Sequence, residues 1–215
     1  KAMKICMLEP ADSQECLDMT KAAYEISEKY ESPVMIRLTT RVDHSKSLVE
    51  LGERKEVPAG PYVKQRDRLD DVPAVSKQRR YVIEEREKQL KEYSENSPFN
   101  YEEMHDTKIG IVASGVAYMY AKEVLGDKAS YLKIGFSYPL PIEKIRAFSK
   151  KVDTLYVVEE LDPVMEEQIK AAGIDCHGKD VIPNIDELNP NIVATGILGK
   201  GFPSKTVPDG LFVPR

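Results

Sequence analysis

The densest group of chemically active side chains in this sequence is Thr39-Thr40-Arg41-Val42-Asp43-His44-Ser45, which directly follows the apolar run 34–38. An arginine can bind a carboxylate through two parallel hydrogen bonds, and a histidine exchanges a proton near neutral pH. Loops at strand ends often carry function, so Thr40, Arg41 and His44 are our candidate site residues. The alternative is a capped loop whose hydroxyl and guanidinium groups only satisfy backbone atoms.

Three polar pairs offer weaker candidates. Ser114-Gly115 ends an apolar run and could bind a phosphate or carboxylate, but it lacks the G-x-G-x-x-G spacing and a P-loop lysine, so we favour a tight strand-to-helix turn. Glu159 and Glu160 are neighbours on a predicted strand and point to opposite faces, so they cannot share a proton, and we expect one to contact a neighbouring domain. Cys176-His177 has no further metal ligands nearby, which indicates ordinary strand-end residues and no metal site.

Composition excludes several classes of protein. The 215 residues carry 31 Lys and Arg against 36 Asp and Glu, a net charge of −5, which argues against a nucleic-acid binder. No run approaches the roughly 20 apolar residues of a membrane span, and the N-terminus has no signal-peptide core. The cysteines at 6, 16 and 176 are odd in number and lack a C-x-x-C spacing, which argues against disulfides or a cysteine-ligated cluster and fits a cytoplasmic protein.

The elements that position these residues fall into two groups separated by a connector. Residues 5–42 predict strand, helix and strand, with Asp12 as the N-cap of the helix and Glu15 as its capping-box partner. Residues 53–106 predict a connector that contains prolines, a glycine and a polar helix at 76–96. The prolines after Lys179 predict a linker leaving the domain.

A strand–helix rhythm runs through residues 108–178. The predicted strands are 108–115, 131–136, 154–159 and 174–177, and the predicted helices are 116–125, 141–151 and 163–172. This alternation predicts an α/β fold with a mainly parallel open sheet and helices on both faces.

Several long motifs, in order along the chain, carry a family resemblance. They resemble the alpha subunit of indolepyruvate ferredoxin oxidoreductase, a thiamine diphosphate-dependent 2-oxoacid:ferredoxin oxidoreductase. The motifs are Glu9-Pro-Ala-Asp-Ser-Gln-Glu15, Pro33-Val-Met-Ile-Arg-Leu-Thr-Thr-Arg41 with His44-Ser45, Gly110-Ile-Val-Ala-Ser-Gly-Val-Ala-Tyr118, Lys133-Ile-Gly-Phe-Ser-Tyr-Pro-Leu-Pro141 and Val157-Val-Glu-Glu-Leu161, with Arg86, residues 92–95 and Ser97-Pro98 in the connector.

The resemblance implies a domain plan for an internal fragment. Residues 1–52 would be the end of a pyrimidine-binding domain, 53–106 a helical connector, 107–200 a transketolase C-terminal-like domain, and 201–215 a linker to a missing diphosphate-binding domain. Gly126-Asp-Lys128 and Asp209-Gly210 are not the Gly-Asp-Gly magnesium motif of the family. The fragment alone is therefore expected to hold no catalytic residue and to be inactive.

The resemblance also implies an activity for the whole enzyme. It would be an oxidoreductase that decarboxylates aryl pyruvates such as indolepyruvate, passes the electrons through iron–sulfur clusters to ferredoxin and gives the acyl group to coenzyme A. Thiamine diphosphate, magnesium and [4Fe-4S] clusters would belong to the complete enzyme, with none bound to this fragment. Its partners would be a beta subunit, ferredoxin, the aryl pyruvate and coenzyme A, without nucleic acid or membrane.

Thr40, Arg41 and His44 are placed on the substrate side because their strand end should face the domain junction. Two alternatives stay open: a non-catalytic interaction module of transketolase-like descent, and another thiamine enzyme such as transketolase or the beta part of pyruvate dehydrogenase.

Overall fold

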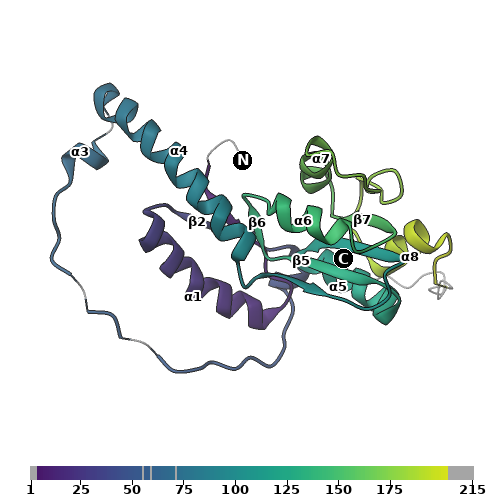
Figure 1. Ribbon diagram of the computed structural model, residues 1–215. Helices are drawn as coiled ribbons and strands as arrows, with labels where there is room; N and C mark the ends of the chain where they lie inside the picture. The colour runs from purple at the N-terminus through teal and green to yellow at the C-terminus, as the bar shows by residue number, and fades with distance from the viewer. Residues whose placement is uncertain (1–3, 55, 59, 71, 203–215) are drawn as a thin grey trace.

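The chain folds around two β-sheets flanked by helices (Figure 1). The computed structural model describes residues 4–54, 56–58, 60–70 and 72–202. The elements in chain order are β1 (Cys6–Leu8), α1 (Ser13–Tyr30), β2 (Val34–Ile36), α2 (Thr40–Asp43), α3 (Arg66–Leu69), α4 (Pro73–Asn96), β3 (Asn100–Glu103), β4 (Ile109–Ser114), α5 (Gly115–Leu125), the 3-10 helix η1 (Gly126–Lys128), β5 (Ser130–Ile134), β6 (Phe136–Tyr138), α6 (Ile142–Ser149), β7 (Thr154–Val158), α7 (Val164–Ala171) and α8 (Pro190–Leu198).

The smaller sheet has the strand order β2-β1-β6, with β1 parallel to β2 and antiparallel to β6. Asp12 caps α1 as predicted, since its side chain accepts a hydrogen bond from the Glu15 amide at 2.9 Å. The buried core of this part combines residues of β1, α1, α4 and β6: Cys6, Leu8, Met19, Ile26, Leu90 and Phe136.

The larger sheet has the order β3-β5-β4-β7, with β4 parallel to both β5 and β7. Alternate residues of β4 enter two separate cores: Ile111 and Ala113 join the core that contains α5 and α8, whereas Val112 joins the core that contains α6 and α7. Because successive strand residues face opposite sides, helices cover both faces. The predicted α/β fold with a mainly parallel sheet is confirmed.

Gly135 is the point where the chain passes from one sheet to the other. The single strand predicted at 131–136 is in fact β5 followed by β6, and β6 pairs with β1. A Cβ at Gly135 would lie 2.7 Å from the Phe99 carbonyl oxygen and from Met19 Cε, so only glycine fits without displacement. The two sheets are therefore physically joined across the predicted 1–52 and 107–200 regions, whose division into domains stays a prediction.

Three sequence predictions need correction. The antiparallel edge strand β3 was not predicted within the connector, and the strand predicted at 174–177 is reduced to a single bridge between Tyr156 and His177. The linker predicted from Lys179 is wrong, because Asn189 caps the helix α8 and Val193 is buried against α5. Pro190 starts this helix rather than preventing it. The linker predicted at 201–215 lies almost wholly outside the described residues.

The segment before α4 extends away from the sheets. Residues 44–65 contain no helix or strand in their described part, and they run as a wide arc to α3 and the start of α4 (Figure 1). Glu50 and Leu51 anchor the base of the arc on α1 through backbone bonds to the side chains of Gln14 and Lys21. Among the helices of the described ranges, none is long and apolar enough to cross a membrane.

Candidate functional site

The carboxyl ends of β1, β2 and β4 meet at the buried carboxylate of Glu9, which is 6% exposed. Its Oε2 accepts hydrogen bonds from Ser114 Oγ at 2.9 Å and Arg37 Nη1 at 2.7 Å, and its Oε1 accepts one from Ser137 Oγ at 2.7 Å. Ligands of open α/β sheets bind at this edge of the strands. We therefore take the Glu9 cluster, defined as Glu9, Arg37, Ser114 and Ser137, as the centre of the candidate site.

Glu9 lies beside the N-terminus of α5. The sequence left open whether Ser114-Gly115 at this position binds an external phosphate or carboxylate or only forms a tight turn. Gly115 has a φ of +50°, and a Cβ there would lie 4.0 Å from Glu9 Oε2. The positive end of a helix stabilises a nearby negative charge. A carboxylate of the protein itself approaches this turn, which agrees with the favoured interpretation of a tight strand-to-helix turn.

A second ion pair joins α1 to the larger sheet. Lys133 on β5 is 1% exposed, and its ammonium donates to Glu15 Oε1. The same nitrogen lies 5.4 Å from the ring centroids of Tyr101 and Tyr118. Glu15 Oε2 also accepts from the Ala11 amide at 2.8 Å. Because a buried charge is costly without a partner, Glu15 and Lys133 hold the start of α1 against the sheet.

The three predicted site residues lie on α2 and directly after it. Arg41, with 64% of its side chain exposed, binds both carboxylate oxygens of Glu187, and its Nη2 lies 3.1 Å from Oε2. This hydrogen bond and charge raise the pKa of Arg41 and lower that of Glu187. Thr40 is exposed, and His44, also exposed, has its Nε2 3.9 Å from Asp43 Oδ2. The backbone N–H of His44 donates to the Thr40 carbonyl oxygen at 3.0 Å, which closes the short helix. Within the described ranges, no side-chain hydrogen bond or ion pair connects these three residues to one another or to the Glu9 cluster.

The two adjacent glutamates stabilise loops at the end of β7. Glu159 accepts from the amides of Met165 and Glu166, both at 2.9 Å, at the start of α7. Burial raises the pKa of Glu159, although these two bonds act in the opposite direction. Glu160 accepts from the Leu188 amide at 3.0 Å. They act separately, as predicted, but these bonds lie within 107–200 and give no contact with a neighbouring domain.

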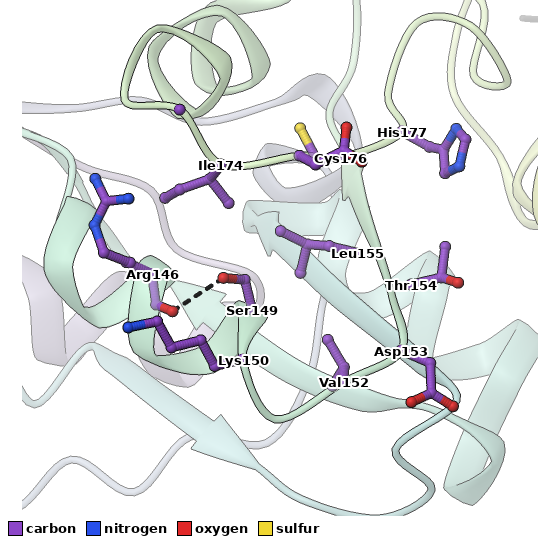
Figure 2. A pocket seen from close by; sticks show the side chains of 12 residues that line it. Arg146, Ser149, Lys150, Val152, Asp153, Thr154, Leu155, Ile174, Cys176 and His177 are labelled. Carbon is purple, nitrogen blue, oxygen red and sulfur yellow. Dashed lines mark hydrogen bonds between the residues drawn. The ribbon is translucent and has the colours of Figure 1, made fainter.

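Cys176 and His177 line a cavity of about 510 Å³ beside β7, opposite the end of α6. Figure 2 shows Arg146 and Lys150 at one end of this cavity and His177 at the other. His177 Nδ1 lies 2.6 Å from Asp180 Oδ2, and its ring stacks on Tyr156. Burial raises the pKa of Cys176 to about 11.

The metals and clusters implied by the resemblance do not fit the residues seen here. No group of three or more His, Cys, Asp or Glu side chains could hold a metal ion in the described part of the chain. The three cysteines lie on β1, α1 and the 174–177 segment, whereas a [4Fe-4S] cluster is usually held by four thiolates. We therefore derive no chemical step through a metal or cluster in this chain.

Known proteins match almost the whole chain. It is 38% identical over 206 residues to indolepyruvate oxidoreductase subunit IorA of Pyrococcus abyssi, 37% over 213 residues to that of Methanothermobacter thermautotrophicus, and 32% over 205 residues to that of Archaeoglobus fulgidus. The chain is a relative of the IorA subunits. The three matches cover 87%, 92% and 92% of this chain but only 32%, 34% and 33% of the relatives. The IorA resemblance inferred from the motifs is confirmed, and the chain spans about a third of the length of these relatives.

A solved structure supports the fold of this IorA relative. The 2-oxoglutarate:ferredoxin oxidoreductase from Magnetococcus marinus, with 2-oxoglutarate, coenzyme A and succinyl-CoA bound, matches with a TM-score of 0.57 at 15% identity. The match covers 80% of this chain and 38% of that chain. No family model matches the sequence.

Sequence reasoning missed the role of Glu9 and the ion pair between Glu15 and Lys133. Glu15 was predicted only as a capping-box partner, and Glu9 and Lys133 drew attention only as parts of the resemblance. A carboxylate directly after a buried strand, at the carboxyl edge of a predicted parallel sheet, was the available signal for Glu9. Nothing in the sequence pairs Glu15 with Lys133, because 118 positions separate them.

Proposed function

We propose that this chain is an internal part of the alpha subunit of an indolepyruvate ferredoxin oxidoreductase. The complete enzyme would catalyse the coenzyme A-dependent oxidative decarboxylation of aryl pyruvates and pass electrons to ferredoxin. The observation that carries the proposal is the 38% identity to an indolepyruvate oxidoreductase subunit across 87% of this chain. The fold of a 2-oxoacid:ferredoxin oxidoreductase agrees with it.

In this proposal the chain positions other parts of the enzyme. Residues 1–52 end the pyrimidine-binding domain, 53–106 connect, and 107–200 form the transketolase C-terminal-like domain. The Glu9 cluster and the Glu15–Lys133 pair fix the first region against the third, so that their strand ends share one edge. Thiamine diphosphate, magnesium and the clusters would be held by the rest of a cytoplasmic enzyme, and this chain alone would not turn over substrate.

The substrate-side assignment of Thr40, Arg41 and His44 also belongs to this proposal. Arg41 follows the carboxyl end of β2, and its guanidinium is largely exposed although Glu187 holds it. A substrate carboxylate that displaces the Glu187 carboxylate would accept the same pair of hydrogen bonds from the Arg41 guanidinium. Arg41→Ala in the complete enzyme should raise the KM for indolepyruvate; an unchanged KM and turnover would refute the assignment.

The test of the function is reconstitution. The complete alpha subunit that contains this chain is combined with its beta subunit, and dye reduction is measured with indolepyruvate and coenzyme A, against pyruvate and 2-oxoglutarate. We expect reduction that depends on coenzyme A and is fastest with indolepyruvate. Reduction with none of the three 2-oxoacids would overturn the proposal and favour the non-catalytic interaction module.

A further inference from the structure

Three arginines gather where the end of α1 meets α3 and α4. Arg68 Nη1 lies 3.1 Å from Glu31 Oε1, and Arg86 Nη1 donates to the Glu31 carbonyl oxygen at 2.9 Å, so both contact one residue. Arg79 lies seven residues before Arg86 on α4, which is about two turns and about 10 Å along the same helix face. We call Arg68, Arg79 and Arg86 the arginine cluster.

The arginine cluster has more positive charge than the described residues compensate. Glu31 is the carboxylate that pairs with it, whereas three guanidinium groups are present. The Nε atoms of Arg68 and Arg86 are buried and have no hydrogen-bond partner within the described ranges. Arg79 is half-buried and likewise has no hydrogen bond or ion pair with any residue of the described ranges. A buried N–H group without an acceptor costs free energy, and more so on a charged group.

Neighbouring basic residues behave differently. Arg80 Nη2 lies 2.6 Å from Glu84 Oε1, and Lys4 Nζ lies 2.6 Å from Glu84 Oε2. Burial, and then the charge of Arg79, lower the pKa of Arg86. Glu84 therefore compensates Arg80 and Lys4, whereas no described carboxylate pairs with Arg79, within a chain whose net charge is −5.

We propose that Arg68, Arg79 and Arg86 form a binding site for the phosphate group of a small phosphorylated ligand. The guanidinium fork matches phosphate oxygens through paired hydrogen bonds. A phosphate monoester carries a charge of about −1.5 to −2 and three acceptor oxygens, enough to accept bonds from several guanidinium N–H groups and to balance three arginines that have one glutamate partner. A single carboxylate supplies two oxygens and one negative charge. This site is separate from the Glu9 cluster and does not depend on the proposed enzymatic activity.

The test is calorimetric titration of this 215-residue chain with inorganic phosphate and with pyrophosphate, at about 50 mM salt to limit screening. Arg79→Gln removes one positive charge without breaking any described bond. Arg80→Gln removes the same charge from the neighbouring position and serves as the matched control. Far-ultraviolet circular dichroism and the Tm verify that both variants fold.

We expect saturable binding of both anions, with pyrophosphate the tighter. Arg79→Gln should weaken it about tenfold or more, and Arg80→Gln by less than about threefold, because direct charge-assisted bonds exceed screened long-range attraction. Preference for inorganic phosphate over pyrophosphate would overturn the assignment to a phosphorylated ligand and favour the free anion, because pyrophosphate, like such a ligand, carries a phosphoryl group bonded through oxygen. The absence of saturable binding up to about 10 mM, or equal weakening by the two variants, would overturn the proposal, since surface attraction alone does not distinguish adjacent positions.

Discussion

Glu9→Gln provides the sharpest test of the junction between the two sheets. The substitution keeps the shape of the side chain and removes the negative charge that accepts bonds from Ser114, Ser137 and Arg37. Both serine hydroxyls are buried together with Glu9, whereas Arg37 is partly exposed. The loss should therefore come mainly from the two serine bonds, because solvent screens the arginine pair.

The expected magnitude follows from these contacts. Hydrogen bonds to a charged group contribute about 1.5–3 kcal/mol each, and the glutamine amide retains part of both serine bonds because a hydroxyl also accepts. We expect the free energy of unfolding to fall by about 1.5–3 kcal/mol in total. At about 2–4 °C per kcal/mol for a chain of this size, the Tm falls by roughly 3–12 °C.

The assay is urea unfolding at pH 7, followed by circular dichroism, with thermal unfolding in parallel. Glu28→Gln removes the same charge from an exposed position on α1 and should leave both midpoints unchanged. Ser137→Ala should cost less in the Glu9→Gln background than in the wild type, because the two side chains share one bond. A Glu9→Gln midpoint equal to that of Glu28→Gln would refute the role of the Glu9 carboxylate.

Three further predictions concern other buried groups. Burial raises the folded-state pKa of Glu159, so its contribution to stability is lost as the pH rises from about 4 through the folded-state pKa. Glu159→Gln should make the free energy of unfolding decrease less over this pH range, as measured by urea unfolding at several pH values. The same pH dependence in the variant and the wild type would contradict this. Burial raises the pKa of the Cys6 and Cys176 thiols to about 11, and it also raises the pKa of Cys16, which is less buried than the other two. Ellman's reagent at pH 8 should therefore modify Cys16 first, since it is the most accessible thiol, and equal rates at the three thiols would contradict this. Gly135→Ala places a Cβ 2.7 Å from the Phe99 carbonyl oxygen and should lower the free energy of unfolding by about 1–3 kcal/mol. Thermal unfolding measures the loss, and an unchanged Tm would show that the backbone between β5 and β6 accommodates the methyl group.

Local signals predicted most of the elements. The Asp12 cap and the apolar run of β4 depend on nearby residues, and both are confirmed. The prediction that failed most clearly was the tail after Lys179, where the spacing of prolines suggested a linker. Asn189 and Pro190 are instead a good helix start, and the decisive factor is the burial of Leu188 and Val193, which local sequence does not reveal.

The sequence by itself determined the family, the α/β class and the alternation of strands and helices, because these depend on motifs and periodicity within short windows. Only the tertiary structure decided that β6 pairs with β1, that Lys133 pairs with Glu15, and that Glu9 approaches the start of α5. These contacts join residues more than a hundred positions apart. Their favourable free energy comes from the pairing of charges and backbone groups that would be costly to bury alone, and these partners meet only once both sheets have formed.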